Sequence, residues 1–518
     1  MILCSFLLVG AAQPDWSLVC CLLTATVGYA LFWKGNFYWK HRYQRFISAS
    51  LWFAAVQALH VNWLTSTRYI GPLILLGYAF ILMLKGVQFG CLSLLVASSR
   101  RILGIAGTWV LMEWFCLLFI FSGYAFDPVG LALSASPLGI QAASLCGALG
   151  LSFWVVTTNL CVLRGQKFWA VLALLFPFAY GAGQLLTHSP KLEEKSEVLL
   201  VQAALPPELR YQINPNVEAL SAPSQWRYML SLLQPYMGEK IDLIVFPESA
   251  VKGSAYSPFY ERDFVDQILA FHLPNVLLPW SEDEYVSNSY WVQAIANTFG
   301  ARVVIGLEED RHNVACYYEP GGEQVQMYSK QQLVPFGEYM PLRKLMEKKP
   351  FSKWITEAYS VASMEHLLFF EPGREGTVLG GDLGVSVCYE EANGGLMLKS
   401  RKKGAKMHVN ISNDGWFPKS RLPVSHFLHG KLRSVEQGVP LVRACNIGVT
   451  CAVDSLGREL GKLPYEGKRT EATADALKLS VPTYTYKTLY SYTGNSLIVA
   501  ISAFFALGIL LQKKKQNM

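Results

Sequence analysis

Charged residues are scarce in this sequence. Asp, Glu, Lys and Arg make up 16% of its 518 residues, whereas hydrophobic types make up 52% and include 28 Phe and 14 Trp. Soluble globular proteins carry about 25% charged residues, so the composition indicates a membrane protein. No internal repeat or low-complexity segment is evident either, which excludes repeat and disordered architectures.

Cysteine spacing of the kind that holds a metal or a disulfide scaffold is also missing. Seven of the 11 cysteines fall in apolar runs, and the rest of the chain holds only Cys316, Cys388, Cys445 and Cys451. Cys445 and Cys451 stand on consecutive predicted strands and could pair in an oxidising compartment, but buried free thiols are the better expectation.

The sequence gives no case for a metal or another cofactor. His426 and His429 are three residues apart on a predicted helix, but no third ligand is evident nearby in the sequence. Arg433 and Glu436 on the same segment indicate an ordinary polar helical face. We therefore expect no metal and no cofactor.

Apolar runs close to the 20 residues that a bilayer-spanning helix needs fill the first 187 residues, and one more closes the chain. The sequence predicts about eight spans, at roughly 2–12, 17–33, 46–63, 69–99, 102–122, 138–163, 168–187 and 496–512. The expected domains are a transmembrane domain at 1–189, a globular domain at 190–487, and a C-terminal transmembrane helix with a basic tail at 488–518.

Basic residues cluster in alternate loops between these runs. The clusters are Lys34 to Arg45, Arg100 with Arg101, Arg164 with Lys167, and Lys513 to Lys515. Because such loops stay in the cytoplasm, the globular domain is predicted to lie outside it. The net charge of +7 therefore reports topology, and no recognition motif points to nucleic acid.

Two features strain this topology. The first run has about 12 residues before Pro14, so it is a short first helix or the apolar part of a signal peptide. Lys85 and Glu113 lie inside predicted spans, where a charge faces a polar cavity, reaches the interface or bonds to another helix. The run at 69–99 could also consist of two pieces, one of them on the membrane surface.

Strand and helix patterns alternate in the globular part. Strands are predicted at 198–202, 242–246, 302–305, 385–388, 407–411, 441–445 and 449–453, and amphipathic helices at 217–233, 259–271 and 424–437. This alternation indicates a layered α/β fold.

Three reactive side chains follow strand-like segments. Glu248 and Cys388 each come directly after a predicted strand, where α/β sheets gather reactive groups, and Lys330 precedes a loop with Pro and Gly. A thiol attacks carbonyls as its thiolate, so an ammonium would stabilise the charge and a carboxylate would move the proton. In isolation, a Cys after a strand is more often a small buried core residue.

Four sequence blocks favour a reactive Cys388 over a buried core cysteine. They are Ile-Val-Phe-Pro-Glu-Ser-Ala (244–250), Tyr-Ser-Lys-Gln-Gln-Leu-Val-Pro-Phe-Gly-Glu-Tyr-Met-Pro (328–341), Val-Cys-Tyr-Glu (387–390) and Asn-Ile-Ser-Asn-Asp-Gly-Trp-Phe (410–417). Their types and order resemble the carbon-nitrogen hydrolase (nitrilase) superfamily and, within it, the membrane-bound apolipoprotein N-acyltransferases. The resemblance covers nearly the whole chain and implies an αββα sandwich for the extracytoplasmic domain.

The resemblance also implies roles for particular residues. Cys388 is the expected nucleophile, Glu248 the proton acceptor, Lys330 the stabiliser of thiolate and oxyanion, and Glu338 an assisting carboxylate. The expected substrate-binding residues are Tyr389, Glu390, Trp416, Phe417 and Tyr211, the last standing where the family tends to carry Trp. Phe246 and Cys445-Asn-Ile-Gly448 also depart from the family pattern, and they alter the lining of the site more than its chemistry.

The implied reaction moves an acyl chain from a phospholipid, with phosphatidylethanolamine as the expected donor, to the α-amine of an S-diacylglyceryl-cysteine lipoprotein. Withdrawing acyl chains from lipid costs about 0.8 kcal/mol per CH₂, which explains a membrane-embedded enzyme. The implied location is the bacterial inner membrane, with the catalytic domain on the periplasmic side, and nothing requires more than a monomer. The amphipathic segment from Lys344 to Phe370 is a candidate lid or a packed surface helix.

Two other functions fit parts of the sequence. One is a membrane-anchored amidase or nitrilase that uses water as acceptor, and turnover of a soluble amide without lipid would favour it. The other is a non-enzymatic membrane protein with a retired hydrolase domain, and function that survives Cys388→Ala would favour that one.

Overall fold

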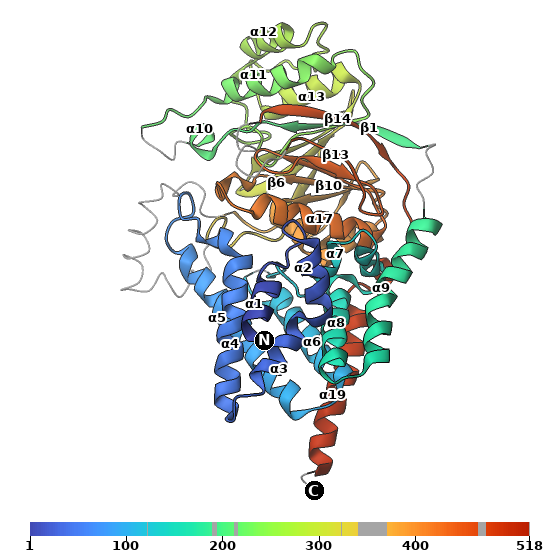
Figure 1. Cartoon of the computed structure of the whole chain (residues 1–518). Coiled ribbons are helices and arrows are strands. Elements are labelled where there is room, and N and C mark those ends of the chain that lie inside the picture. Colours follow the sequence, from blue (N-terminus) through green and yellow to red (C-terminus); the bar gives the residue numbers. More distant parts are fainter. Residues whose placement is uncertain are drawn as a thin grey trace.

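The computed structural model describes residues 1–121, 123–188, 194–211, 216–322, 324–339, 370–464 and 473–516. Figure 1 shows helices of the first 187 residues and the C-terminal helix at one end of the molecule, and a layered α/β part at the other. The predicted lid at 344–370 lies outside the described residues except for Phe370.

Helices form the membrane half. Among the described residues, five helical segments are long and apolar enough to cross a bilayer: Leu18–Asn36, Ile74–Ser98, Ile102–Phe119, Gly139–Leu163 and Lys167–Thr187. These correspond to α2 (Leu18–Leu23), η1 (Thr24–Gly28) and α3 (Tyr29–Asn36); α5 (Ile74–Ser98); α6 (Ile102–Phe119); η3 (Gly139–Ala142) and α8 (Ala143–Leu163); and α9 (Lys167–Thr187). The run predicted at 69–99 is thus a single long helix, α5, after a turn.

The predicted count of about eight spans is not confirmed. The other three runs fall on α1 (Ile2–Gly10), α4 (Arg42–His60) and α19 (Ser496–Gln516). With 9 residues, α1 is too short to span alone, and the apolar part of α19 that the structure describes is the shorter Ser496–Ile509. Polar side chains, including buried Gln57 and His60, lower the hydropathy of α4.

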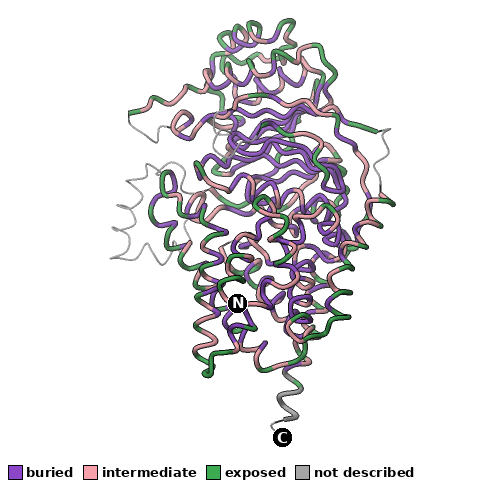
Figure 2. Tube along the Cα trace, viewed as in Figure 1, coloured by how far each residue is buried: buried purple, intermediate pink, exposed green. Residues whose placement is uncertain are grey.

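The outer surface of the membrane half is apolar. Large hydrophobic side chains such as Leu51, Phe119 and Leu186 are exposed there, and Figure 2 shows exposed residues along the outward faces of these helices. An exposed apolar surface of this kind is suited to contact with lipid. This half of the chain is therefore an integral membrane domain.

Two six-stranded sheets form the core of the other half (Figure 1). The first has the order β14-β1-β2-β5-β6-β7, and the second β13-β12-β11-β10-β9-β8. The strands are β1 (Lys195–Gln202), β2 (Leu243–Val245), β5 (Arg302–Glu309), β6 (His312–Tyr318), β7 (Gln326–Ser329), β8 (Val378–Leu379), β9 (Leu383–Val387), β10 (Met407–Ser412), β11 (Leu441–Cys445), β12 (Cys451–Val453), β13 (Glu459–Lys462) and β14 (Asp475–Pro482), with β3 (Tyr260–Glu261) and β4 (Tyr285–Val286) pairing separately. β1, β2 and β5 run parallel, as do β9, β10 and β11.

Helices cover the outer faces of both sheets. The first sheet carries α11 (Ala222–Leu233), α12 (Arg262–His272) and α13 (Asn288–Phe299), and the second carries α16 (Gly394–Lys402) and α17 (Leu422–Gln437). The short elements are α7 (Leu131–Ser134), α10 (Pro207–Arg210), α18 (Leu489–Thr493), η2 (Asn62–Thr65), η4 (Gln234–Tyr236), η5 (Cys388–Ala392) and η6 (Asp414–Trp416). The four layers are the predicted αββα sandwich.

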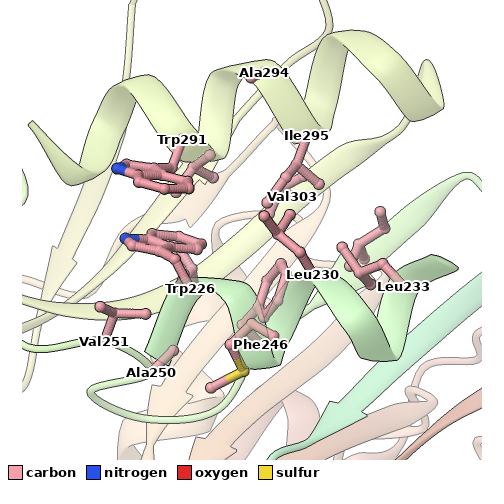
Figure 3. Close-up of a cluster of buried hydrophobic side chains, with 14 of the residues drawn as sticks. Trp226, Leu230, Leu233, Phe246, Ala250, Val251, Trp291, Ala294, Ile295 and Val303 are labelled. Carbon is pink, nitrogen blue, oxygen red and sulfur yellow. The ribbon is translucent and has the colours of Figure 1, made fainter. Parts of the chain in front are cut away.

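Alternation along β1 explains why the layers stack. Leu199 and Val201 pack against the helices, whereas Val198 and Leu200 face the second sheet, because successive side chains point to opposite faces of a strand. Figure 3 shows the helix side of this core, where Trp226 of α11 and Trp291 of α13 lie parallel, with ring centroids 5.3 Å apart.

The strand predictions at 198–202, 242–246, 302–305, 385–388 and 407–411 are confirmed. The helix predicted from 217 begins at Ala222 instead, because Ser221 caps it and a Pro occupies its first turn. Strand β6 lies between the motif blocks and was not predicted, whereas β7 ends in the strand-like segment that precedes Lys330. Cys445 and Cys451 are free and buried, as expected.

The two halves share an extensive contact through α17. Its Leu432 and Val435 belong to the hydrophobic core of the membrane helices. Gln141 Nε2 donates to the Leu456 carbonyl at 2.8 Å, and Glu436 Oε1 accepts from the Ala148 backbone N–H at 2.8 Å. This contact holds the layered part directly on the membrane helices.

Candidate active site

Glu248, Lys330 and Cys388 come together where strands of the two sheets end. Glu248 follows β2, Lys330 follows β7 and Cys388 follows β9. Gly306 of β5 lets the chain around Glu248 approach closely, since a methyl group there would lie 2.6 Å from Glu248 Cα. All three side chains are at least nine-tenths buried and line one cavity.

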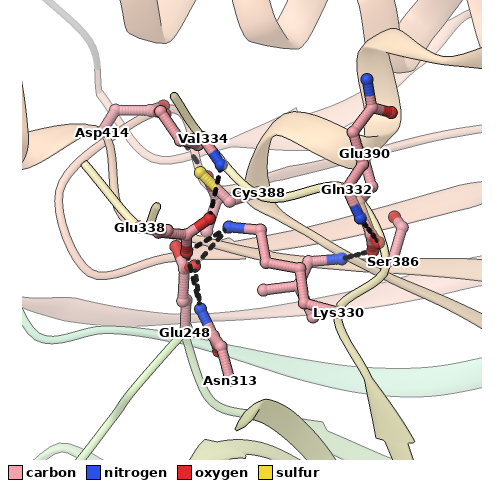
Figure 4. A network of polar contacts seen from close by, with 12 residues as sticks. Glu248, Asn313, Lys330, Gln332, Val334, Glu338, Ser386, Cys388, Glu390 and Asp414 are labelled. Carbon is pink, nitrogen blue, oxygen red and sulfur yellow. Dashed lines mark hydrogen bonds and ion pairs between the residues drawn. The ribbon is translucent and has the colours of Figure 1, made fainter. Parts of the chain in front are cut away.

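Lys330 forms a four-residue polar cluster with Glu248, Glu338 and Asn313 (Figure 4). Lys330 Nζ lies 3.1 Å from Glu248 Oε1 and 2.7 Å from Glu338 Oε1. Asn313 Nδ2 donates to the same two oxygens, at 2.7 and 3.1 Å. Glu338 is held in turn by the Val334 backbone N–H, which donates to its Oε2 at 2.8 Å.

Asn313 was not predicted from the sequence. It lies on β6 beside His312 and belongs to none of the four motif blocks. The residues next to Asn313 in the sequence form no motif that indicates a site. Asn313 reaches the two glutamates only through the pairing of β6 with β5 and β7.

Cys388 occupies a strained turn at the end of β9. Its φ is 52°, a left-handed conformation that is uncommon for a residue other than Gly. Asn410 Nδ2 donates to the Cys388 carbonyl at 3.2 Å and supports this turn from β10. The turn presents the thiol to the cavity at the carboxyl end of the parallel strands.

The charges around Cys388 favour a neutral thiol at rest. Burial raises the pKa of Cys388 well above its usual value, and Glu248 raises it further, while the ammonium of Lys330 lowers it without offsetting both. Burial disfavours the ammonium of Lys330, but Glu248, Glu338 and Cys388 outweigh burial and hold its pKa well above the usual value. The arrangement therefore suits a thiol that loses its proton to a carboxylate during attack.

Tyr389 and Glu390 follow Cys388 and are both buried. Tyr389 donates its hydroxyl to the Gly123 carbonyl at 2.7 Å, and its ring stacks on Phe126 at the cavity wall. Glu390 is fully buried and accepts from Tyr328, whose hydroxyl is 2.8 Å away, and from the backbone N–H groups of Val387, Gln331 and Gln332. These bonds tie the Cys388 turn to the Lys330 loop, and the described lining of the cavity includes Tyr389 but not Glu390.

Aromatic side chains line the cavity beside the thiol. The Tyr211 ring stacks on Trp416 with centroids 5.8 Å apart, and Phe417 meets Trp63 of the membrane half edge-on at 5.1 Å. The cavity has an empty volume of about 1170 Å³, including its open mouth. Its apolar walls come from both halves of the chain.

A second charged network lies under the thiol and was not predicted. His426 Nδ1 lies 2.6 Å from Asp414 Oδ1, and Arg443 donates to Asp414 Oδ2 at 3.1 Å and to Glu391 Oε1 at 2.9 Å. Burial would raise the pKa of Asp414, but His426 and Arg443 outweigh it and lower that pKa to about 2. The partners are distant in sequence, which is why no local pattern revealed them.

This network bears on the question of a metal. Cys388, Asp414 and His426 offer one ligand atom each within 4.8 Å of one another, so His426 has neighbours of metal-binding type that the sequence does not reveal. The Arg443 guanidinium already holds one oxygen of Asp414 and His426 the other, and the fixed positive charge of Arg443 disfavours a cation there.

Replacing Arg443 by methionine is expected to lower the free energy of unfolding by about 3–5 kcal/mol, because it leaves buried Glu391 without its bonded cation and Asp414 with His426 alone. Thermal or denaturant unfolding in detergent measures the change. Lys462→Met is the control, since the side chains of Lys462 and Glu459 in this surface pair are 46% and 35% exposed and its loss should cost under about 1 kcal/mol. Equal effects of the two changes would contradict this interpretation.

The fold and the site define a class of protein. The carbon-nitrogen hydrolase family model matches residues 210–502, which hold all four residues of the Glu248–Lys330–Glu338–Cys388 cluster. The chain belongs to the carbon-nitrogen hydrolase family. A second model, of the apolipoprotein N-acyltransferase N-terminal domain, matches residues 5–161, and with the relatives below it places the chain among the apolipoprotein N-acyltransferases.

Relatives with this name match along the whole chain. The apolipoprotein N-acyltransferase of Chlamydia pneumoniae is 34% identical over 98% of this chain and 95% of its own length. That of Chlamydia trachomatis serovar D is 32% identical over 100% of this chain and 98% of its own. A crystal structure of a carbon-nitrogen hydrolase from Helicobacter pylori G27 aligns at 16% identity over 56% of this chain and 89% of its own, with a TM-score of 0.36.

Proposed function

We propose that this acyltransferase moves an acyl chain from phosphatidylethanolamine through a thioester on Cys388 to the α-amine of an S-diacylglyceryl-cysteine lipoprotein. One observation carries the proposal. The thiol–ammonium–carboxylate cluster opens into a cavity whose apolar wall includes Ile74 and Ile81 of membrane helix α5. A soluble amide needs no such wall, whereas an acyl chain gains about 0.8 kcal/mol for each CH₂ that it keeps out of water.

In the first half-reaction, Cys388 Sγ attacks the ester carbonyl while Glu248 takes the thiol proton. Lys330 and the Tyr389 backbone N–H stabilise the oxyanion of the tetrahedral intermediate. The C–O bond then breaks, and the lysophospholipid alkoxide leaves with the proton that Glu248 returns. Glu338 and Asn313 keep the ammonium of Lys330 in place.

In the second half-reaction, the free α-amine of the acceptor attacks the thioester carbonyl. An α-ammonium has a pKa of about 7.7–8.0, so a substantial share of the amine is neutral near neutral pH. Glu248 takes the amine proton as the C–N bond forms and passes it to the departing thiolate, which restores the Cys388 thiol. Tyr211, Trp416 and Phe417 would contact the lipid parts of the substrates.

The wider setting belongs to the same proposal. The basic loops would be cytoplasmic, which puts the catalytic domain on the periplasmic side of the inner membrane. The proposed domains are 1–189 (transmembrane), 190–487 (catalytic) and 488–518 (C-terminal helix), in a chain that acts as a monomer without nucleic acid. Phe370, the one residue of the segment 344–370 that the structure describes, lines the cavity.

Incubation of the purified protein with phosphatidylethanolamine alone is expected to add one acyl mass to Cys388, detectable by intact mass and removed by hydroxylamine. A diacylglyceryl-cysteine peptide should then take up the chain as an amide. Cys451→Ala is the matched control, because it removes another buried thiol and should leave the adduct unchanged. An adduct that discharges only to water, together with turnover of a soluble amide, would support an anchored amidase instead.

A further inference from the structure

A second cavity lies directly beyond the apolar cavity of the reactive site. Its empty volume is about 480 Å³, and the two cavities share the side chains of Tyr124 and Phe126. Away from Glu248, Lys330 and Glu338 the first is walled mainly by apolar and aromatic residues, whereas the second includes four charged side chains, Lys85, Glu113, Arg433 and Glu436, among apolar ones. A ligand that extends from the first cavity toward the second therefore meets an abrupt change in polarity.

Helix α5 passes from one cavity to the other. Ile74, Gly77 and Ile81 line the first cavity, and the next residue on the same helical face, Lys85, lines the second. The distance from residue 74 to residue 85 is about 16 Å along the axis, at about 1.5 Å per residue. We call the apolar row Ile74, Gly77 and Ile81 the α5 stripe. Gly77 leaves room on this stripe for the ring of Phe336 from the Glu338 loop, since a methyl group at position 77 would lie 2.9 Å from that ring.

Lys85 is the charged residue that follows the apolar residues Ile74, Gly77 and Ile81 on this face of α5. Lys85 is 3% exposed, and among the described residues it has no hydrogen bond or ion pair. Its Nζ lies 5.6 Å above the ring of Tyr124, which forms the wall between the cavities. An apolar chain end that reached this ammonium would remove it from any remaining water without offering it a partner, which is unfavourable.

Glu113 makes the polar end rigid. Its Oε1 accepts from Trp109 Nε1 and from the Val129 backbone N–H, both at 2.9 Å, while its Oε2 has no partner among the described residues. These bonds tie α6 to the segment that follows Tyr124 and Phe126. The wall between the cavities is therefore fixed from the membrane side. Glu113 lines the second cavity, and its hydrogen bonds go to its own helix and to Val129 outside any helix, so the predicted hydrogen bond to another helix is not confirmed.

We infer that the α5 stripe measures the transferred acyl chain, with its carbonyl at Cys388 and its methyl end stopped by Ile81 and Tyr124 in front of Lys85 and Glu113. This inference rests on the proposed function and adds chain-length selection to it. Methylene groups are stabilised along the apolar stripe, and further ones would have to displace the charged end of the cavity. Ile81, Tyr124 and Lys85 would then be specificity-determining residues.

The test uses the full-length protein in vesicles that contain equal amounts of phosphatidylethanolamine with myristoyl, palmitoyl, stearoyl or arachidoyl chains. Initial amounts of each acyl-Cys388 species, read by intact mass, give the chain preference in one sample. Lys85→Met should shift the preference to longer chains, by up to about fourfold per additional buried methylene. Ile81→Phe fills the stripe earlier and should shift the preference to shorter chains.

Opposite shifts in the two variants would support the inference, since loss of stability cannot produce them. Unchanged ratios in both variants, or shifts in the same direction, would overturn it. If Lys85→Met does not fold, the pair Ile81→Phe and Ile81→Ala decides the question with both charges in place, the second being expected to favour longer chains. Met83→Leu on the exposed face of α5 is the matched control. Absence of every adduct in the unmodified protein would instead refute the proposed function.

Discussion

Replacing Cys388 by alanine is expected to lower N-acyl transfer by at least about 10⁴-fold, because no other group in the site can carry the acyl chain as a thioester. The Cys388 thiol lies in a strained turn at the end of β9. Glu248 and Lys330 line the same cavity as this thiol. Transfer of a labelled chain from phosphatidylethanolamine to a diacylglyceryl-cysteine peptide measures the loss.

The control for this change is a thiol of similar burial outside the cavity. Cys316 is fully buried on β6, where burial raises its pKa to about 12, and Cys316→Ala should keep acyl transfer near the unmodified rate. Unfolding midpoints of both variants show that the fold persists. Substantial transfer by Cys388→Ala would favour direct attack of the amine on the phospholipid, without an acyl-enzyme.

Replacing Glu248 by glutamine is expected to have two opposite effects. Acyl transfer should fall by about 10²–10⁴-fold, because the thiol and the amine both lose their proton acceptor. Alkylation of Cys388 by iodoacetamide at pH 8 should become faster, because the Glu248 carboxylate contributes to the raised pKa of the thiol. An anion disfavours the thiolate, so its removal lowers the thiol pKa and increases the reactive fraction.

Rates of alkylation measured across pH, with Cys388 identified by peptide mass, separate these effects. The apparent pKa should be lower in Glu248→Gln than in the unmodified protein, and Glu239→Gln, which removes a carboxylate paired with Lys478 on the surface, should leave it unchanged. Slower alkylation in Glu248→Gln would mean that the carboxylate holds the thiol in an accessible position and does not act through its charge.

Part of this site was predictable because its residues lie in short motifs. Glu248, Lys330, Glu338 and Cys388 each stand in a block whose residue types are tied to chemistry, and the strands before Glu248 and Cys388 have the apolar pattern of buried strands. The same reasoning could not find Asn313, Asp414 or Arg443. Asn313 and Arg443 are polar residues on strands without a local signature, and Asp414, although it stands in the fourth block, has partners that only the fold brings to it.

The span count shows another limit of local patterns. Hydropathy identified eight apolar runs, and five of them are helical segments long and apolar enough to cross a bilayer among the described residues. The other runs include α1, which is short, and α4, which carries polar side chains with internal partners. Gln57 and His60 of α4 bind Asp127 at 2.5 and 2.8 Å, a contact across 67 to 70 residues. Whether a polar residue in an apolar run faces lipid or a partner depends on packing.

The amino-acid sequence by itself determined the membrane character and the layered α/β class, because composition and strand periodicity are local properties. Its motif blocks also singled out Glu248, Lys330, Glu338 and Cys388 as candidate site residues through their resemblance to a family. Only the tertiary structure decided which side chains surround the thiol, how the charges set its protonation, and where the apolar cavity ends at Lys85 and Glu113. These depend on contacts between segments far apart in the chain, and local sequence patterns do not encode the distances between them.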